Sequence, residues 1–380
     1  MNASKKIRVM LVVPMLDQGG LERVCALTSQ LLQNKYEVYV VVFNGIGRIY
    51  DVSGAELIDL GLGAVSNKWG KLLQVVKRAA RLSKIVKEKK VQIVYSFGRT
   101  ANIACSLIYT KVKKICACHS HEEIKNIKYL RLMDKRADII LCCSKAMAKE
   151  VGTCIGSDKV KAVWNPCDIQ DIQQLAEVSL PAFQEFFKHH NKIIVAMGRE
   201  DDVKGYWHLI KAFYLVQKEI PQMRLIIMGD GSFEQAKSLV SELQLEQKVY
   251  FPGVRKNPYK YLAASEMFLL SSYTEGFPNV LVEAMILGRP LISTDCRTGP
   301  AEILEHGKYG ILVPDMGDTE DYSGDTISEK ETYFAEKIIE VLKDSERQKE
   351  LSELERKRAG EFDYDSYVDN LLKLCYNKSL

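Results

Sequence analysis

The stretch LLSSYTEGFPNVLVEAMILGRPLISTDCRTGP, residues 269–300, decides the fold that this sequence predicts. It has the pattern of a strand, a glycine-containing loop, a short helix, a tight turn and a second strand. Pro278 suits the first position of the helix, because its missing N–H would have no partner there. The apolar pattern of residues 279–287 continues the helix, and Gly288 suits the left-handed residue that ends it. The stretch therefore predicts one strand–helix–strand unit.

Two carboxylates frame this unit: Glu275 lies in the loop and Glu283 lies within the predicted helix. Between them, the helix N-terminus offers unpaired N–H groups and the positive end of the helix dipole, which together favour an anion. The segment thus combines an anion site with two strong acceptors for hydroxyl groups, and a phosphorylated sugar has this chemistry. Two glutamates at this spacing also occur by chance, so the spacing alone leaves a purely structural role open.

The length of 380 residues favours two domains, and the composition, 47% hydrophobic and 27% charged, is that of an ordinary globular protein. No apolar run approaches the roughly 20 residues that a membrane span needs, and the N-terminus shows no apolar segment of a secretory signal. The ten cysteines are scattered without the spacing of zinc ligands, so we expect reduced thiols and a cytoplasmic protein.

The net charge of +4 hides a strong asymmetry between the two halves of the chain. Residues 1–165 carry 28 Lys and Arg against 13 Asp and Glu, a balance of +15, whereas the remainder carries 25 against 36, a balance of −11. The basic residues cluster in Lys68–Lys90 and Lys125–Arg136, which predicts an anionic partner such as a membrane surface. No basic motif studded with aromatic residues accompanies them, so we do not expect nucleic acid. The alternative is that both clusters are simply solvated helix faces.

Short apolar strands alternate with helical patterns along both halves of the chain, which predicts parallel α/β sheets. A break follows Asn165-Pro166, and the alternation restarts with a strand at residues 192–197. We therefore expect a first domain at residues 1–166, a linker at 167–190 and a second domain at 191–363. Strands are expected at residues 7–13, 37–43, 91–95, 114–118, 139–142, 160–163, 192–197, 224–228, 249–251 and 267–270. Helices are expected at residues 71–87, 233–243, 258–264, 279–287, 331–342 and 364–375, with a further one from Tyr206 and an acidic surface loop at 317–330.

The run EGFPNV at residues 275–280, followed by Glu283 and by Gly288-Arg-Pro, closely resembles the signature of the retaining nucleotide-sugar glycosyltransferases of family 4. This resemblance implies the GT-B fold, in which two Rossmann-like, doubly wound parallel-sheet domains hold the donor cleft between them. It also implies that the last helix, about residues 364–380, returns to pack on the first domain. The resemblance extends over nearly the whole chain and is most specific across residues 198–313.

Two cations, Arg199 and Lys204, follow the strand expected at residues 192–197. This is the carboxyl edge of a parallel sheet, where ligands bind in such folds. Taken alone, solvated surface charges explain the two cations better than a diphosphate site does. The resemblance implies that both grip the donor diphosphate and replace a divalent ion, so no metal and no cofactor are expected. The Asp-x-Asp string at 363–365 opens the last predicted helix, where capping explains it better than metal binding.

Glycines in the first strand–helix loop, Gly19 and Gly20, allow a ligand to approach the backbone closely, although a simple turn explains them equally well. His119 follows the strand at 114–118, with His121 close by, and a structural role is the alternative to a catalytic one. The resemblance implies that the glycines face donor and acceptor and that His119 lies near the donor sugar. It implies four catalytic residues, Glu275, Arg199, Lys204 and His119, and ten donor-binding residues, Gly19, Gly20, Gly198, Val254, Gly276, Phe277, Pro278, Asn279, Val280 and Glu283.

The function that follows from the resemblance is transfer of a hexose or N-acetylhexosamine from a nucleotide sugar, with UDP favoured, to a glycan or lipid-linked acceptor. The implied setting is bacterial surface polysaccharide synthesis on the inner face of the cell membrane. The anomeric configuration would be retained, by attack on the face that the nucleotide leaves. Two alternatives stay open: another GT-B enzyme acting on nucleotide sugars, such as an epimerase or a phosphorylase, and a basic membrane-binding module.

Overall fold

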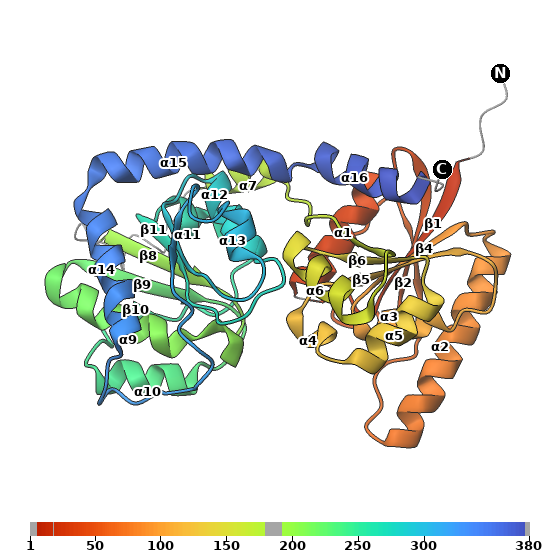
Figure 1. Ribbon diagram of the computed structural model, residues 1–380, viewed down its shortest axis with the longest axis horizontal. Helices are drawn as coiled ribbons and strands as arrows, with labels where there is room; N and C mark the ends of the chain where they lie inside the picture. Colours follow the sequence, from red (N-terminus) through yellow and green to blue (C-terminus); the bar gives the residue numbers. More distant parts are fainter. Residues whose placement is uncertain (1–5, 18, 179–191, 377–380) are drawn as a thin grey trace. The chain divides into compact units, whose positions relative to one another are not determined.

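The computed structural model describes residues 6–17, 19–178 and 192–376, and it divides the chain into two compact units (Figure 1). The first unit comprises residues 1–166 together with 364–380, and the second comprises residues 167–363. Each unit is built around its own parallel sheet and is described by itself. Among the described helices, none combines the length with the hydropathy of a membrane crossing.

The first unit contains a seven-stranded parallel sheet with the strand order β3-β2-β1-β4-β5-β6-β7. The order reverses direction between β1 and β4, which is the arrangement of a doubly wound sheet. The strands are β1 (Ile7–Val13), β2 (Tyr36–Val42), β3 (Glu56–Asp59), β4 (Ile93–Phe97), β5 (Lys113–Cys118), β6 (Ile139–Cys142) and β7 (Val160–Ala162).

Helices cover both faces of this sheet, and alternate residues of β1 face the two resulting cores. Val9, Leu11 and Val13 join the core beneath α1 and α16, whereas Met10 and Val12 join the core beneath α2 and α3. On the second face α2, α3, α5 and α6 form a row of neighbours (Figure 1). The helices are α1 (Gly20–Leu32), α2 (Lys68–Glu88), α3 (Arg99–Ser106), α4 (His121–Ile124), α5 (Ile127–Arg136), α6 (Lys145–Ile155) and α16 (Tyr364–Tyr376).

The last helix, α16, belongs to the first unit although the whole second unit precedes it in the sequence. The Tyr367 hydroxyl lies 2.8 Å from the Thr28 hydroxyl of α1, and both side chains are buried. Val368 and Leu371 are buried in the same core. The chain therefore returns to close the face of the first sheet that α1 leaves partly open.

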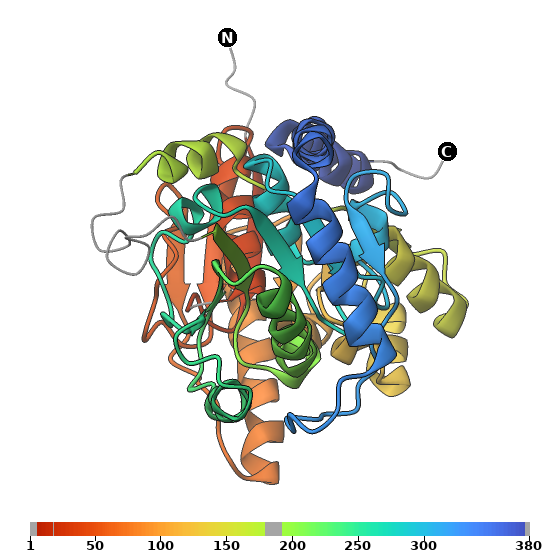
Figure 2. The same cartoon turned by 90° about the vertical axis from the view of Figure 1, so that its left-hand side faces the viewer.

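The second unit contains a six-stranded parallel sheet with the order β10-β9-β8-β11-β12-β13. Its core holds the fully buried rings of Trp207, Phe213 and Phe334, and α14 lies alongside α9 (Figure 2). The strands are β8 (Lys192–Met197), β9 (Met223–Met228), β10 (Val249–Tyr250), β11 (Met267–Leu270), β12 (Leu291–Thr294) and β13 (Ile311–Val313). The helices are α7 (Ile169–Ala176), α9 (Tyr206–Glu219), α10 (Glu234–Glu242), α11 (Tyr259–Ala263), α12 (Asn279–Ile286), α13 (Pro300–Ile303), α14 (Glu329–Lys343) and α15 (Ser345–Ala359).

Several sequence predictions need correction at element ends. Pro278 caps α12 (φ −71°, ψ 93°) and does not occupy its first turn, which begins one residue later. The helix expected from Glu331 begins two residues earlier, because Ser328 and Glu331 form a reciprocal capping box that fixes the start at Glu329. The linker has a polar, helical-looking sequence, and its described part does contain a helix, α7, which packs on α11 and α12 of the second unit. Residues 179–190 of that linker lie outside the described residues.

Candidate functional site

Lys204 lies at the carboxyl edge of the second sheet, where close packing of the neighbouring backbone fixes its position. Gly205 has φ +57°, and a Cβ there would lie 2.5 Å from the carbonyl oxygen of Ser271, so only glycine fits. The Ser271 hydroxyl donates to the Lys204 carbonyl over 2.7 Å, and the Tyr273 N–H donates to the Val203 carbonyl over 3.0 Å. These contacts tie the turn before α9 to the loop after β11, so the lysine stands at a fixed point.

Lys204 forms an ion pair with Glu275. Lys204 follows β8 and Glu275 follows β11, so the pair joins the carboxyl ends of two neighbouring strands. Lys204 Nζ lies 2.7 Å from Glu275 Oε1, and the two side chains are only 18% and 11% exposed. The Ser272 hydroxyl donates to the same carboxylate oxygen over 2.7 Å. The Thr298 hydroxyl donates to the Glu275 carbonyl, and the Glu275 N–H donates to the Arg297 carbonyl over 3.3 Å. The carboxylate is therefore held in place on both its side chain and its backbone.

The loop from Gly276 to Pro278 leads from this carboxylate into α12. It passes very close to Gly299, where φ is +75° and a Cβ would lie 2.7 Å from Pro278 Cδ. Phe277 is buried against the ring of Phe362, with ring centroids 5.8 Å apart. Residues 279 and 280 form the first turn of α12, and Glu283, only 4% exposed, lies one turn further along. The predicted residues 275–280 and 283 thus form one continuous segment at this sheet edge.

Arg199 stands apart from the Lys204–Glu275 pair. Its guanidinium donates to Asp201 Oδ2 through Nε over 3.1 Å and through Nη2 over 2.9 Å. The Arg199 side chain is 74% exposed. Exposed pairs of this kind contribute little to stability, so Asp201 can release the arginine to a stronger anion at little cost. Gly198 directly precedes Arg199, and a Cβ on it would lie only 3.1 Å from Lys204 Cε. Its carbonyl accepts from the Tyr206 hydroxyl over 2.8 Å. Val254, in the loop after β10, is 40% exposed, which suits contact with a ligand.

His119 lies at the carboxyl edge of the first sheet, directly after β5. Its ring stacks on Phe97 with centroids 5.8 Å apart, and neither ring nitrogen finds a hydrogen-bond partner among the described residues. Burial lowers the pKa of His119 to about 4, so the imidazole is neutral at pH 7. Glu123, a residue that sequence reasoning missed, accepts the N–H groups of His119 over 2.7 Å and Ser120 over 3.3 Å. The backbone is thereby fixed, while both ring nitrogens are buried without a hydrogen-bond partner among the described residues.

Gly19 and Gly20 mark the start of α1, at the end of the loop after β1. Gly19 is the N-cap in extended conformation, and Gly20 is the first helical residue. A Cβ on Gly19 would lie 2.0 Å from a carboxylate oxygen of Glu22, so a larger residue would push that side chain aside. Both glycines share the carboxyl edge of the first sheet with His119, because all seven strands are parallel.

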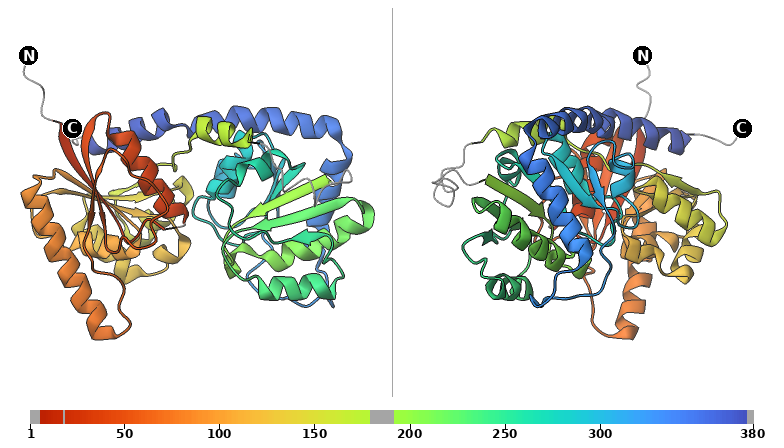
Figure 3. Two further views of the ribbon diagram at one scale, coloured as in Figure 1. Left: turned by 180° about the vertical axis from the view of Figure 1, so that it is seen from behind. Right: turned by 60° about the vertical axis from the view of Figure 1, so that its left-hand side comes forward.

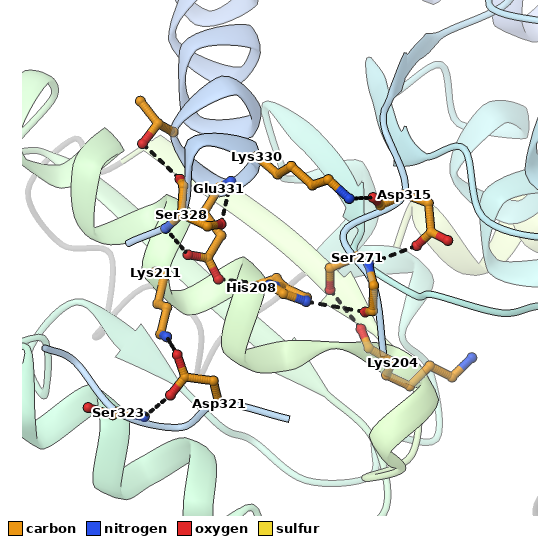
Figure 4. A network of polar contacts seen from close by, with 12 residues as sticks. Lys204, His208, Lys211, Ser271, Asp315, Asp321, Ser323, Ser328, Lys330 and Glu331 are labelled. Carbon is orange, nitrogen blue, oxygen red and sulfur yellow. Dashed lines mark hydrogen bonds and ion pairs between the residues drawn. The ribbon is translucent and has the colours of Figure 1, made fainter. Parts of the chain in front are cut away.

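A polar network behind Lys204 holds the loop at residues 314–328 to α9 (Figure 4). His208 Nδ1 lies 2.7 Å from Glu331 Oε1, and Lys211, only 1% exposed, places its Nζ 2.5 Å from Asp321 Oδ2. The Lys204 side chain points away from this network, whereas its carbonyl takes part through Ser271. The acidic loop that we expected at the surface is therefore partly an anchor of α9, and so of the turn that carries Lys204.

The described residues contain no group of three or more His, Cys, Asp and Glu side chains placed to hold a metal ion. At the carboxyl edge of the second sheet lie the cations Arg199 and Lys204, the Glu275 carboxylate and the start of α12. Such a set can bind a diphosphate with the cations and sugar hydroxyls with the carboxylate.

Comparison with known proteins agrees with this chemistry. Glycosyltransferase Family 4 matches residues 18–171, and Glycosyl transferases group 1 matches residues 181–358. An uncharacterized glycosyltransferase of Methanocaldococcus jannaschii is 31% identical over 334 residues, which are 78% of this chain and 82% of that protein. The chain belongs to glycosyltransferase family 4.

Two further relatives come from Campylobacter jejuni. The N-acetylgalactosamine-N,N'-diacetylbacillosaminyl-diphospho-undecaprenol 4-alpha-N-acetylgalactosaminyltransferase is 28% identical over 318 residues, 78% of this glycosyltransferase and 83% of that enzyme. The GalNAc-alpha-(1->4)-GalNAc-alpha-(1->3)-diNAcBac-PP-undecaprenol alpha-1,4-N-acetyl-D-galactosaminyltransferase is 25% identical over 381 residues, 97% of this chain and 98% of that enzyme.

Solved structures share the fold of this glycosyltransferase. Anabaena Alr3699/HepE in complex with UDP-glucose gives a TM-score of 0.77 at 18% identity, covering 98% of this chain and all of that one. TarM gives a TM-score of 0.79 at 15% identity, covering 99% and 100%. The predictions of the family, of the GT-B fold with two parallel-sheet α/β domains, and of a transferase are confirmed. The roles of the individual site residues stay predictions.

Proposed function

We propose that this glycosyltransferase moves a hexose or N-acetylhexosamine from a nucleotide sugar, with UDP as the nucleotide, to a glycan or lipid-linked acceptor in bacterial polysaccharide synthesis. The observation that carries the proposal is the largely buried ion pair of Lys204 with Glu275, whose carboxylate also accepts a hydrogen bond from Ser272. The names of the Campylobacter jejuni relatives, which specify N-acetylgalactosamine transfer to undecaprenol-linked acceptors, support the acceptor class. The UDP-glucose complex of the Anabaena protein supports the donor class.

The cations provide the electrostatic part of the reaction in this proposal. Negative charge builds on the diphosphate as the bond to the sugar breaks, and Lys204 offers a fixed ammonium group to that charge. Arg199 exchanges its exposed contact with Asp201 for a bidentate contact with a phosphate. Because two cations meet the diphosphate, the proposal requires no divalent ion.

The carboxylates orient the donor in the same proposal. Glu275 accepts hydrogen bonds from hydroxyls of the donor sugar, while the N–H groups of residues 276–280 and the dipole of α12 favour the anionic part. Glu283, only 4% exposed in the free protein, holds the ribose hydroxyls. The neutral ring of His119 accepts a hydrogen bond from a sugar hydroxyl at a nitrogen that has no partner among the described residues. The acceptor hydroxyl attacks the anomeric carbon on the face that the diphosphate leaves and gives its proton to the departing phosphate oxygen. The nucleoside diphosphate is released, and the anomeric configuration is retained.

A thermal-shift panel followed by product analysis tests the proposal. UDP-sugars should raise the melting temperature more than GDP- or ADP-sugars, because a ligand at about 100 times its Kd adds roughly 2.7 kcal/mol of stability. Proton NMR of the glycoside formed from the best donor should show the anomer of the donor. Stabilisation by none of the nucleotide sugars, or an inverted product, would refute the assignment.

A further inference from the structure

An apolar stripe lies exposed on the N-terminal half of α2, in the first unit. Trp69, Leu72, Leu73 and Val76 follow the i, i+3, i+4, i+7 spacing of one helix face, and each is more than half exposed. The Trp69 side chain, at 84%, is nearly as open as in an extended chain. None of the four belongs to the buried core of the unit. The stripe is thus a contiguous apolar surface, and such surfaces mark interaction sites.

The stripe is not needed to hold α2 in place. On the opposite side of the helix, the Arg78 guanidinium donates to the carbonyl of Leu62 over 2.6 and 3.0 Å and to that of Gly63 over 2.9 Å. The same guanidinium lies over the ring of Phe43, and Leu82 and Val86 are buried below. The inner face alone therefore fixes the helix, which leaves the stripe to another partner.

The surroundings of the stripe are strongly basic. Residues 60–87 contain seven Lys and Arg and no Asp or Glu. Beyond the stripe, a groove along α2 is lined by Lys77, Arg81, Lys84 and Lys87 together with the exposed ring of Tyr109. The one acid beside it, Glu88, pairs with Lys84 over 3.6 Å. An apolar stripe beside a basic groove is the pattern of helices that lie in the interface of an anionic membrane.

The position of the stripe in the fold fits an acceptor at a membrane. Because α2 follows β3, it begins at the carboxyl edge of the first sheet, the edge that also carries His119 and the glycines before α1. Its first turns extend away from the rest of the unit (Figures 1 and 3). Trp69 stands at this protruding end, and tryptophan is the residue that favours the boundary between lipid and water.

The geometry points to α2 as an interfacial anchor: Trp69, Leu72, Leu73 and Val76 insert into an anionic lipid bilayer while the lysines and arginines of the groove contact its headgroups. This rests on the proposed function, because it explains how a soluble enzyme meets a lipid-linked acceptor. A second copy of the chain packed stripe to stripe is a poor occupant, since it would bring the same excess of positive charge to the stripe. Purely electrostatic attachment would leave the apolar stripe in water.

The intrinsic fluorescence of the full chain tests the insertion directly. The chain has three tryptophans; Trp207 is fully buried, Trp164 is partly covered by Lys145, and Trp69 is open. On vesicles of phosphatidylglycerol and phosphatidylcholine, the emission should shift to shorter wavelength and should be quenched by brominated lipid chains. The variant Trp69→Phe should lose both signals while still sedimenting with the vesicles.

Substitutions on the stripe give the second measurement. The double variant Leu72→Glu/Leu73→Glu should weaken vesicle partitioning by about tenfold or more for each lost anchor. Tyr333→Glu, at an exposed aromatic of the second unit, is the matched control and should bind like the wild type. Both stripe variants should melt like the wild type and should keep transfer to a soluble acceptor analogue, which separates this test from that of the proposed function.

The outcomes are distinct. Binding to anionic vesicles with the Trp69 shift, partly resistant to 1 M salt, supports the anchor. Three results overturn it: no binding to anionic vesicles at low salt, binding without any change of Trp69 emission, and a dimer in sedimentation analysis that the double variant abolishes. The last result would assign the stripe to a second copy of the chain.

Discussion

Glu275 and His119 occupy equivalent places in the two units, since each lies at the carboxyl edge of a parallel sheet, yet their surroundings are opposite. The Glu275 carboxylate is fixed by Lys204 and Ser272, each at 2.7 Å. Neither His119 nitrogen meets a hydrogen-bond partner among the described residues, although the ring is buried. The second unit therefore has a carboxylate whose position is fixed by its neighbours, whereas the first has a buried polar ring without a partner among the described residues, which is unusual for a buried polar group.

Replacing Glu275 is the most severe way to break this comparison. The variant Glu275→Gln should lower kcat/KM by about 10²–10³-fold, the usual effect of removing one preorganised group that acts on the reacting centre. The measurement is transfer from the donor that the thermal-shift panel selects. Glu320→Gln, on the exposed part of the loop at 314–328, is the control and should be fully active. Wild-type activity in Glu275→Gln would remove this residue from the site.

The two cations should differ in importance because they differ in fixation. Lys204→Ala removes a positioned ammonium and should cost about 10²-fold in kcat/KM, whereas Arg199→Ala removes an exposed group and should cost about tenfold. EDTA should leave the wild type active, because the proposed function assigns the neutralisation of the diphosphate to these two cations. Equal losses in the two variants would contradict the difference in fixation, and inhibition by EDTA that magnesium reverses would contradict metal independence.

His119 should report itself through the pH dependence of stability. Its pKa, about 4 in the folded protein, lies below the ordinary value of 6.5, so the unfolded chain binds the proton more readily. The neutral ring contributes stability that is fully present above pH 6.5 and is lost as the pH falls towards 4. The loss at pH 5 amounts to about 2 kcal/mol of unfolding free energy. Denaturant unfolding of the wild type and of His119→Gln at pH 7 and 5 measures this difference. The variant should lose less stability between the two pH values than the wild type, and an equal loss would show that the ring is charged when folded.

The Lys211–Asp321 pair offers a structural counterpart to Lys204–Glu275. Asp321→Ala leaves a buried ammonium without its carboxylate and should destabilise by about 1–3 kcal/mol. Lys211→Met should cost about 1 kcal/mol or less, because the 43% exposed Asp321 returns to water. Melting curves measure the stability, and kcat for both variants should stay within a factor of about two at temperatures where they are folded. A large loss of kcat without loss of stability would give this pair a direct role in the reaction.

Much of the fold follows from apolar patterns. The strands at 7–13, 139–142, 192–197 and 267–270 have the predicted ends, because each is a largely buried run directly preceded by a polar or charged residue. The strand β3 (Glu56–Asp59) was missed, since it lies at the sheet edge and none of its residues is buried. The helix α15 was also missed, because its sequence is polar around most of its surface.

The sequence predicted which residues of the site lie together at the sheet edge, but not the contacts that each of them makes. The rule that parallel strands end at one edge brings Lys204 and Glu275 together, although 71 positions separate them. The partner of Arg199 was not foreseen, because Asp201 competes for it only in the folded turn. The exposed apolar stripe beginning at Trp69 was not predicted, because residues 68–90 were described only by their basic residues. The sequence gives the period of a helix, but it does not show which helix face stays exposed.

The return of α16 to the first unit sets the order in which the newly made chain can fold. The first 166 residues leave the ribosome early, but Tyr367, Val368 and Leu371, which complete their core, follow about 200 residues later. At about 5–20 residues per second, the face of the first sheet beside α1 waits roughly 10–40 s for its cover. The second unit is continuous in sequence and can finish in that interval. During synthesis the N-terminal half is thus the last to mature, and its open apolar face is where a chaperone would bind the nascent chain.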